Sequence, residues 1–129
     1  MRQSKWVEYG KRKNLENKIK SKLKKHNLNY LKIHGGVYQV SGRPDLLIFN
    51  NFNTYAMELK SDFKISKPSK LQISQANAHK NNLIWLFVDI NNYKEIIEAV
   101  INNNINYLKH IAQKQLEYWM DYFNNEKTL

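Results

Sequence analysis

Hydrophobic residues recur along the chain at two spacings, and the spacing separates expected helices from expected strands. Between residues 12 and 26, Leu15, Ile19 and Leu23 recur every four residues, which predicts a helix with one buried stripe. Short apolar or alternating stretches predict strands at 30–34, 37–40, 45–49 and 54–60. Residues 1–11 are polar with isolated aromatic residues, which predicts a mobile arm or a partner contact.

The second half of the chain predicts three helices and one strand. Ser69-Lys70-Leu71-Gln72 has the serine and glutamine of a capping box, so a helix is expected from there to about residue 81. The run 83–88 is the most apolar of the chain and predicts a central strand covered on both faces. Helices are expected at 93–103 and from 105 to about 124.

The last expected helix has apolar residues on two sides. One stripe can pack against the domain, and the other is rich in tyrosine: Tyr107, Ile111, Tyr118 and Tyr122. This second stripe indicates either a partner, most simply a second copy of the chain, or a thick single core.

Two acids and a lysine are expected to meet on one hairpin. Residues 50–53 are suited to a turn, because asparagine tolerates positive φ. The hairpin would fold the start of its first strand onto the end of its second, so Asp45 would meet Glu58 and Lys60. Two carboxylates at one point suit Mg²⁺ or Mn²⁺, and a nearby lysine can orient or deprotonate an attacking water. The pattern therefore predicts a site that cleaves phosphodiesters.

Other residues near this hairpin have two interpretations each. Glu16, the single acid of the helix expected at 12–26, is either an ion-pair partner of the surrounding lysines or a catalytic residue. Gln72 either completes the capping box or places an amide at a helix N-terminus, where phosphates bind readily. Gln75 lies along the same helix face. The basic loop at 61–68 is a natural contact for a phosphate backbone.

Composition narrows the class of protein. A chain of 129 residues is expected to form one domain, and 42% hydrophobic residues are ordinary for a globular protein. The absence of cysteine excludes disulfides and thiolate metal sites. No apolar run is long enough to cross a bilayer and no signal peptide is recognised, so we expect a cytoplasmic protein without membrane contacts.

The charge balance indicates a polyanionic partner. Lysine and arginine outnumber aspartate and glutamate by 21 to 11, which gives a formal net charge of +10. The positive electrostatic field of such a chain attracts nucleic acid. The alternative is a basic surface that serves only solubility.

The order helix, three strands, helix, strand, with these acids, lysine and glutamine along it, resembles the PD-(D/E)xK nuclease superfamily. More closely, residues 32–39, 42–47, 58–60 and 69–72 look like the stand-alone phage VRR-NUC domains. The resemblance covers about residues 12–90. It implies an α/β fold with a restriction-endonuclease-like αβββαβ core, in which helices flank a mixed central sheet. Helices at about 91–129 would extend this core within a single domain of residues 1–129.

The resemblance also implies roles for particular residues. The expected metal ligands are Asp45, Glu58 and the backbone carbonyl of Leu59. The expected catalytic residues are Glu16, Asp45, Glu58, Lys60 and Gln72, with Gln75 as the alternative to Gln72. The expected DNA contacts are Lys32, His34, Arg43, Lys64, Lys67, Lys70 and Gln75.

A Mg²⁺- or Mn²⁺-dependent endodeoxyribonuclease is the activity that the resemblance implies. It would act as a homodimer on branched or structured DNA, like a junction resolvase, in the cytoplasm of a bacterial or phage-infected cell. The alternative is a non-catalytic nucleic-acid-binding module, in which Asp45, Glu58 and Lys60 would form a structural ion-pair cluster. The chain departs from relatives at Asn51 and Asn53, and at 81–82, where relatives often carry glycine.

Overall fold

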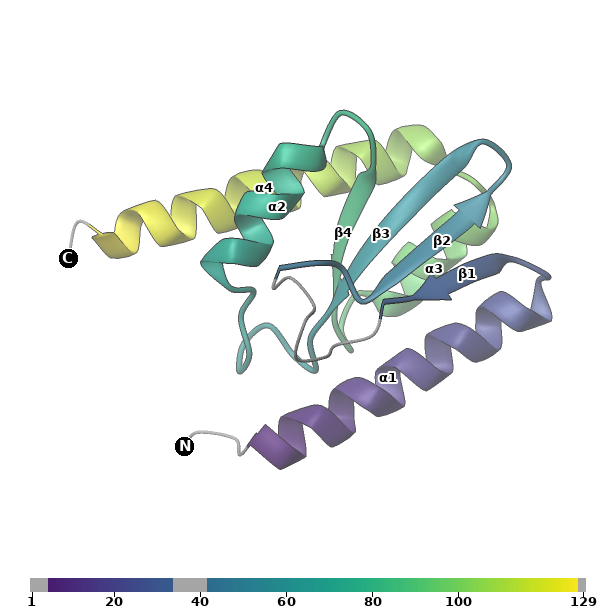
Figure 1. The fold of residues 1–129 in the computed structure, drawn as a ribbon, viewed down its shortest axis with the longest axis horizontal. Helices are drawn as coiled ribbons and strands as arrows, with labels where there is room; N and C mark the ends of the chain where they lie inside the picture. Colours follow the sequence, from purple (N-terminus) through teal and green to yellow (C-terminus); the bar gives the residue numbers. More distant parts are fainter. Residues whose placement is uncertain (1–4, 34–41, 128–129) are drawn as a thin grey trace.

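A four-stranded sheet lies between two layers of helices in the computed structural model, which describes residues 5–33 and 42–127 (Figure 1). The elements of this part follow in the order α1 (Lys5–Lys25), β1 (Asn29–Lys32), β2 (Leu46–Asn50), β3 (Asn53–Leu59), α2 (Lys70–His79), β4 (Ile84–Val88), α3 (Tyr93–Ile101) and α4 (Ile105–Lys127). The class is α/β, and the order αβββαβ followed by two helices is the predicted one. The strand predicted at 37–40 lies outside the described residues.

The sheet is mixed, with the spatial order β1-β2-β3-β4. The pairs β1–β2 and β2–β3 are antiparallel, whereas β3 and β4 are parallel and joined through α2. In the β2–β3 hairpin Asn50 pairs with Asn53, and Asn51 takes a φ of 56°, as the turn prediction required. Leu46 pairs with Met57, and the N–H of Asp45, one residue earlier, donates to the carbonyl of the same Met57, so Asp45 lies at the end of β3 beside Glu58.

The two faces of the sheet are covered by different helices, except that α4 reaches both of them. The α1 and α3 face buries Leu15, Ile19, Leu23, Leu46, Ile48, Tyr55, Met57, Leu59, Leu86, Val88, Ile96, Ile97 and Val100, among others. The α2 and α4 face buries Ala56, Ile73, Ala76, Trp85, Phe87 and Trp119. Since side chains alternate along a strand, Glu58 shares the second face with Ala56 and points towards α2.

The first helix begins earlier than its apolar pattern indicates. Residues 5–11 belong to α1, so the prediction of a mobile arm there is wrong for this segment. Trp6 is 84% exposed, and these turns therefore gain little from apolar burial. Instead, Glu8 accepts hydrogen bonds from the backbone N–H of Ser61, at 3.2 Å, and from its hydroxyl. A polar contact with the loop after β3 thus extends the helix beyond its buried stripe.

The strand β4 stands at one end of the described sheet, so the prediction that it is central is wrong. Its residues are nonetheless buried, because helices cover both faces and α4 covers its outer edge. The side-chain amide of Gln115 accepts from the N–H of Phe87 at 2.9 Å and donates to its C=O at 2.8 Å. A side chain thereby takes the place that a neighbouring strand would occupy.

The C-terminal helices are anchored to the sheet. Leu108 and Trp119 of α4 are buried, whereas Tyr118 is 61% exposed. Asn50 donates to the carbonyl of Val100 at 2.8 Å, which ties the end of α3 to the β2–β3 hairpin. None of the helices in the described ranges has the length and apolar character needed to cross a membrane.

Candidate active site

Asp45 and Glu58 meet where β2 begins and β3 ends. The backbone N–H of Asp45 donates to the carbonyl of Met57 at 2.8 Å, and the N–H of Leu59 donates to Asp45 Oδ2 at 2.7 Å. The side chain of Glu58 is 1% exposed, and its Oε1 accepts from Gln72 Nε2 at 2.5 Å. A backbone N–H holds the Asp45 carboxyl, and the Gln72 amide holds that of Glu58. The predicted meeting of these two side chains is what the hairpin register produces.

The surroundings of Glu58 disfavour its negative charge. Burial raises the pKa of Glu58 first, and the adjacent charge of Asp45 raises it further. The positive charges of Lys60 and Arg12 act in the opposite direction, and the resulting pKa is about 9. Glu58 Oε2 is buried and accepts no hydrogen bond. A buried carboxylate oxygen without a donor is costly, so this carboxyl holds a proton or needs a cation.

The donor atoms at this point fit a hard divalent ion. Asp45 and Glu58 supply carboxylate oxygens, and the orphaned Oε2 of Glu58 is a ready donor. The backbone N–H of Leu59 points towards Asp45. In a β-strand the N–H and C=O of one residue point to the same side, so the Leu59 carbonyl also faces β2. No group of three His, Cys, Asp or Glu side chains gathers within residues 5–33 and 42–127. The protein would thus contribute two carboxylates and one carbonyl to the six or more ligands that such ions take.

Two cations act on the carboxyl pair. Lys60 follows Leu59 directly, and its backbone N–H donates to the carbonyl of Val88 at 3.0 Å, which continues the β3–β4 pairing past the site. Arg12, on α1, is the second cation, since its charge lowers the pKa of Glu58. Sequence reasoning did not single out Arg12, because nothing in a helix with many basic residues marks one of them as close enough to act on Glu58.

Glu16 is buried but belongs to a separate cluster. It is 3% exposed and pairs with Lys13 at 3.1 Å, with Lys20 at 2.9 Å and with Lys32 of β1. Burial raises the pKa of Glu16, but the hydrogen bonds from Lys32, Lys20 and Lys13 outweigh it and lower the pKa to about 2. The hydrogen bonds described for Glu16 all go to these lysines and not to Asp45 or Glu58.

Gln72 completes the predicted capping box and also contacts the carboxyl pair. Its Oε1 accepts from the N–H of Ser69 at 2.8 Å while its own N–H donates to the Ser69 hydroxyl at 3.1 Å, which completes the capping box. The other end of the same amide reaches Glu58. Gln75 instead packs by Gly42, whose φ is 86°: a Cβ added there would lie 3.1 Å from Gln75 Cγ. The contact with Glu58 favours Gln72 over Gln75 as the predicted catalytic glutamine.

The predicted DNA contacts are distributed unevenly. Exposed basic side chains of this set are Arg43, Lys64, Lys67 and Lys70. Lys32 is partly buried in its ion pair with Glu16, and Gln75 is half-buried. His34 lies outside the described residues. The loop after β3 and the start of α2 therefore provide most of the accessible positive charge near the site.

Comparisons with protein-family models, with curated proteins and with solved structures find no match to this chain. The α/β class follows from the described elements alone, whereas the resemblance to a nuclease family remains a prediction. The homodimer likewise remains a prediction, because the structure holds one chain.

Proposed function

We propose that the protein is a Mg²⁺- or Mn²⁺-dependent endonuclease that hydrolyses phosphodiester bonds in DNA. The observation that supports this most strongly is the pair Asp45–Glu58, in which one carboxyl is buried, has an oxygen without a donor and has a pKa of about 9. Carboxyl pairs of this kind bind divalent cations well, because the ion removes the repulsion and replaces the lost water.

Each residue of the site has a distinct task in this proposal. Asp45, Glu58 and the Leu59 carbonyl would hold the ion, which when bound would polarise the scissile phosphate and offset its developing charge. The Lys60 ammonium would hydrogen-bond the attacking water and add positive charge beside the phosphate. Gln72 would keep Glu58 in a single orientation through its hydrogen bond to Oε1. The charge of Arg12 would favour ionised Glu58, the form that binds a cation.

DNA is the proposed substrate because of the charge of the chain and its distribution. The net charge is +10, and exposed Lys64, Lys67 and Lys70 follow the site along the chain. Branched or structured DNA, cut by a homodimer in the cytoplasm, is the more specific proposal, and it depends on the family resemblance described above.

Nicking of supercoiled plasmid tests the activity. We expect Asp45→Asn and Lys60→Ala to lose nicking with Mn²⁺ by about 1,000-fold, since several kcal/mol of transition-state stabilisation would be removed. DNA binding, measured in parallel, should largely survive. Lys109→Ala, an exposed lysine of α4 outside the site, is the matched control and should nick normally. Undiminished cleavage by pure Asp45→Asn protein would reject the assignment.

Calorimetric titration separates the enzyme from a module that only binds nucleic acid. The proposed nuclease should give a saturable heat with Mg²⁺ in the absence of DNA, and Glu58→Gln should abolish it. A binding module in which Asp45, Glu58 and Lys60 are structural should give no such heat while still binding DNA.

A further inference from the structure

A groove with aromatic walls and basic side chains lies between the loop after β3 and α4. Its volume is about 510 Å³. We call it the stacking groove and define it by the side chains that matter below: Phe63, Lys64, Lys67, Lys114, Tyr118 and Trp119. The loop was predicted to contact DNA. The α4 side, which lies outside the family resemblance, includes Tyr118 of the stripe predicted to contact a partner, most simply a second copy, or to belong to a thick single core.

Phe63 and Trp119 form the base of the stacking groove, beside the exposed ring of Tyr118. Trp119 is 5% exposed, and Phe63 packs against it with ring centroids 5.5 Å apart. Tyr118 meets Trp119 edge-on at 4.9 Å yet is 61% exposed. An aromatic ring that is anchored by a buried neighbour and remains largely exposed is suited to stacking on a planar ligand.

The positive charge of the stacking groove favours a polyanionic ligand. Lys64, Lys67 and Lys114 line it, and within the described lining Glu95 is the single acid. Lys114 also lies 3.8 Å from Glu117, but both side chains are more than half exposed, so this pair is weak. A twofold contact between copies of the chain would set this basic patch against itself, which disfavours a second copy as the occupant.

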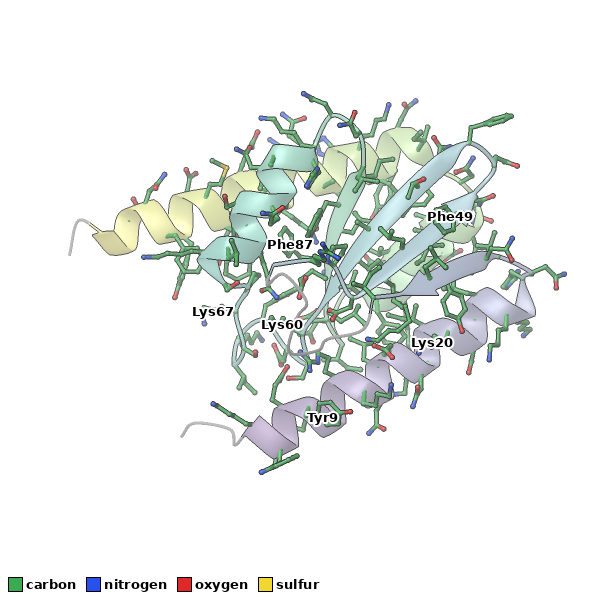
Figure 2. All side chains as sticks on the ribbon, viewed as in Figure 1. Tyr9, Lys20, Phe49, Lys60, Lys67 and Phe87 are labelled. Carbon is green, nitrogen blue, oxygen red and sulfur yellow. The ribbon has the colours of Figure 1, made fainter. Side chains whose placement is uncertain are left out.

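The stacking groove lies at the end of the sheet that holds the candidate active site. The N–H of Phe63 donates to Asp89 Oδ2 at 2.9 Å, which fixes the loop beside the end of β4. Figure 2 labels Lys60 and Lys67 at this end of the molecule. Lys64 is four residues beyond Lys60, so their backbones lie within about 14 Å, the length of a few nucleotides.

We propose that the stacking groove binds a single-stranded segment of DNA. An unpaired base stacks on Tyr118, and Lys64, Lys67 and Lys114 contact the adjoining phosphates. Paired bases inside a duplex have no free faces for such stacking, so the groove selects unpaired strands. That the bound strand is a substrate rests on the proposed nuclease function; that it binds does not, because no metal ligand lies in the groove.

Fluorescence anisotropy of the full chain in EDTA tests the inference. The probes are a labelled oligothymidylate of about 15 nucleotides and a blunt duplex of the same length. Tyr118→Ala should weaken binding of the single strand by about 5- to 150-fold and leave the duplex unchanged. Tyr118→Phe should bind both like the wild type. Phe52→Ala, which removes a fully exposed ring at the β2–β3 turn, is the matched control and should have no effect.

Salt dependence provides the second readout. Lys114→Gln should reduce the slope of log affinity against log salt by about 1 for the single strand. Wild-type affinity in Tyr118→Ala, or an equal loss for single strand and duplex, would overturn the proposal. A change of oligomeric state in Tyr118→Ala, measured by sedimentation, would also overturn it, because a second copy would then cover the groove. Repeating the binding series with Asp45→Asn keeps the result independent of cleavage.

Discussion

Two glutamates of this protein are almost equally buried and yet have opposite acidities. Glu16 is 3% exposed with a pKa of about 2, and Glu58 is 1% exposed with a pKa of about 9. Burial raises the pKa of both glutamates, so burial does not explain why the two pKa values move in opposite directions. Their neighbours do: Glu16 has three lysines around it, whereas Glu58 has a second carboxyl beside it.

The two glutamates differ in whether the folded chain supplies a hydrogen-bond donor to each carboxylate oxygen. Both oxygens of Glu16 accept hydrogen bonds from ammonium groups, so the folded chain satisfies it alone. Glu58 has one amide on Oε1 and nothing on Oε2. A buried ion pair of the first kind holds parts of a fold together, while a carboxyl of the second kind is a candidate for ligand binding.

The largest expected effect of the difference between Glu16 and Glu58 is on the pH dependence of Mg²⁺ affinity. Because Glu58 must lose its proton to bind a cation, Mg²⁺ affinity should rise tenfold per pH unit below its pKa of about 9. Between about pH 6.5 and about pH 8.5, calorimetry should record a gain of about 100-fold. Glu58→Gln should remove both the affinity and its slope. An affinity independent of pH across this interval would contradict the raised pKa.

The same group should make the metal-free protein less stable as the pH rises. The pKa of Glu58 rises on folding from 4.5 to about 9, so the folded state binds the proton more tightly across that interval. Thermal unfolding in EDTA should therefore show a falling midpoint from about pH 5 to about pH 9 that flattens in Glu58→Gln.

Replacing Glu16 should cost stability and spare the chemistry. Glu16→Gln should reduce the free energy of unfolding by about 1–3 kcal/mol, since three charge-assisted contacts are lost. The pKa of Glu16 falls on folding from 4.5 to about 2, so its stabilisation is present above pH 4.5 and is lost as the pH falls towards 2. Urea unfolding at neutral and acidic pH measures both effects.

The control for that experiment is Glu117→Gln, which breaks an exposed pair with Lys114 and should cost less than about 0.5 kcal/mol. Nicking per folded molecule should fall less than about tenfold in Glu16→Gln. A loss as large as that of Asp45→Asn would instead assign Glu16 to the catalytic machinery, as the family resemblance implies.

The smallest expected effect is the difference between substitutions of the two glutamines of α2. Gln72→Ala breaks the capping box and the contact with Glu58, so the unfolding free energy should fall by about 1 kcal/mol and nicking should weaken. Gln75→Ala, on the same helix face, should leave the capping box intact and change nicking less. If Gln75→Ala weakened nicking more than Gln72→Ala in the plasmid assay, the catalytic role would be assigned to Gln75.

Local patterns in the sequence predicted the hairpin and its carboxyl pair well. Strand alternation and a turn of asparagines determine the register, and the register brings Asp45 to Glu58. The capping box at Ser69 is equally local, and the structure contains it. Boundaries were less accurate: α2 ends at His79 and α3 at Ile101, each two residues before the predicted end.

Contacts between distant segments could not be predicted in this way. Glu8 reaches Ser61 across 53 positions, and Gln115 reaches Phe87 across 28. The charge of Arg12 acts on Glu58 only because α1 packs beside the sheet. Such pairs depend on how helices dock, and a single chain carries no periodic signal for them. Asn103 is a further example, because its side-chain oxygen accepts a hydrogen bond from the Tyr55 hydroxyl, 48 positions away, at 2.5 Å.

The amide of Gln115 has a consequence for how the chain can be shortened. Without α4, the N–H and C=O of Phe87 would face water as an open margin of the sheet, ready to recruit a strand from another molecule. Truncation before Ile105 should therefore give a protein that aggregates rather than a minimal nuclease. The last helix therefore protects the edge of the sheet as well as lining the stacking groove.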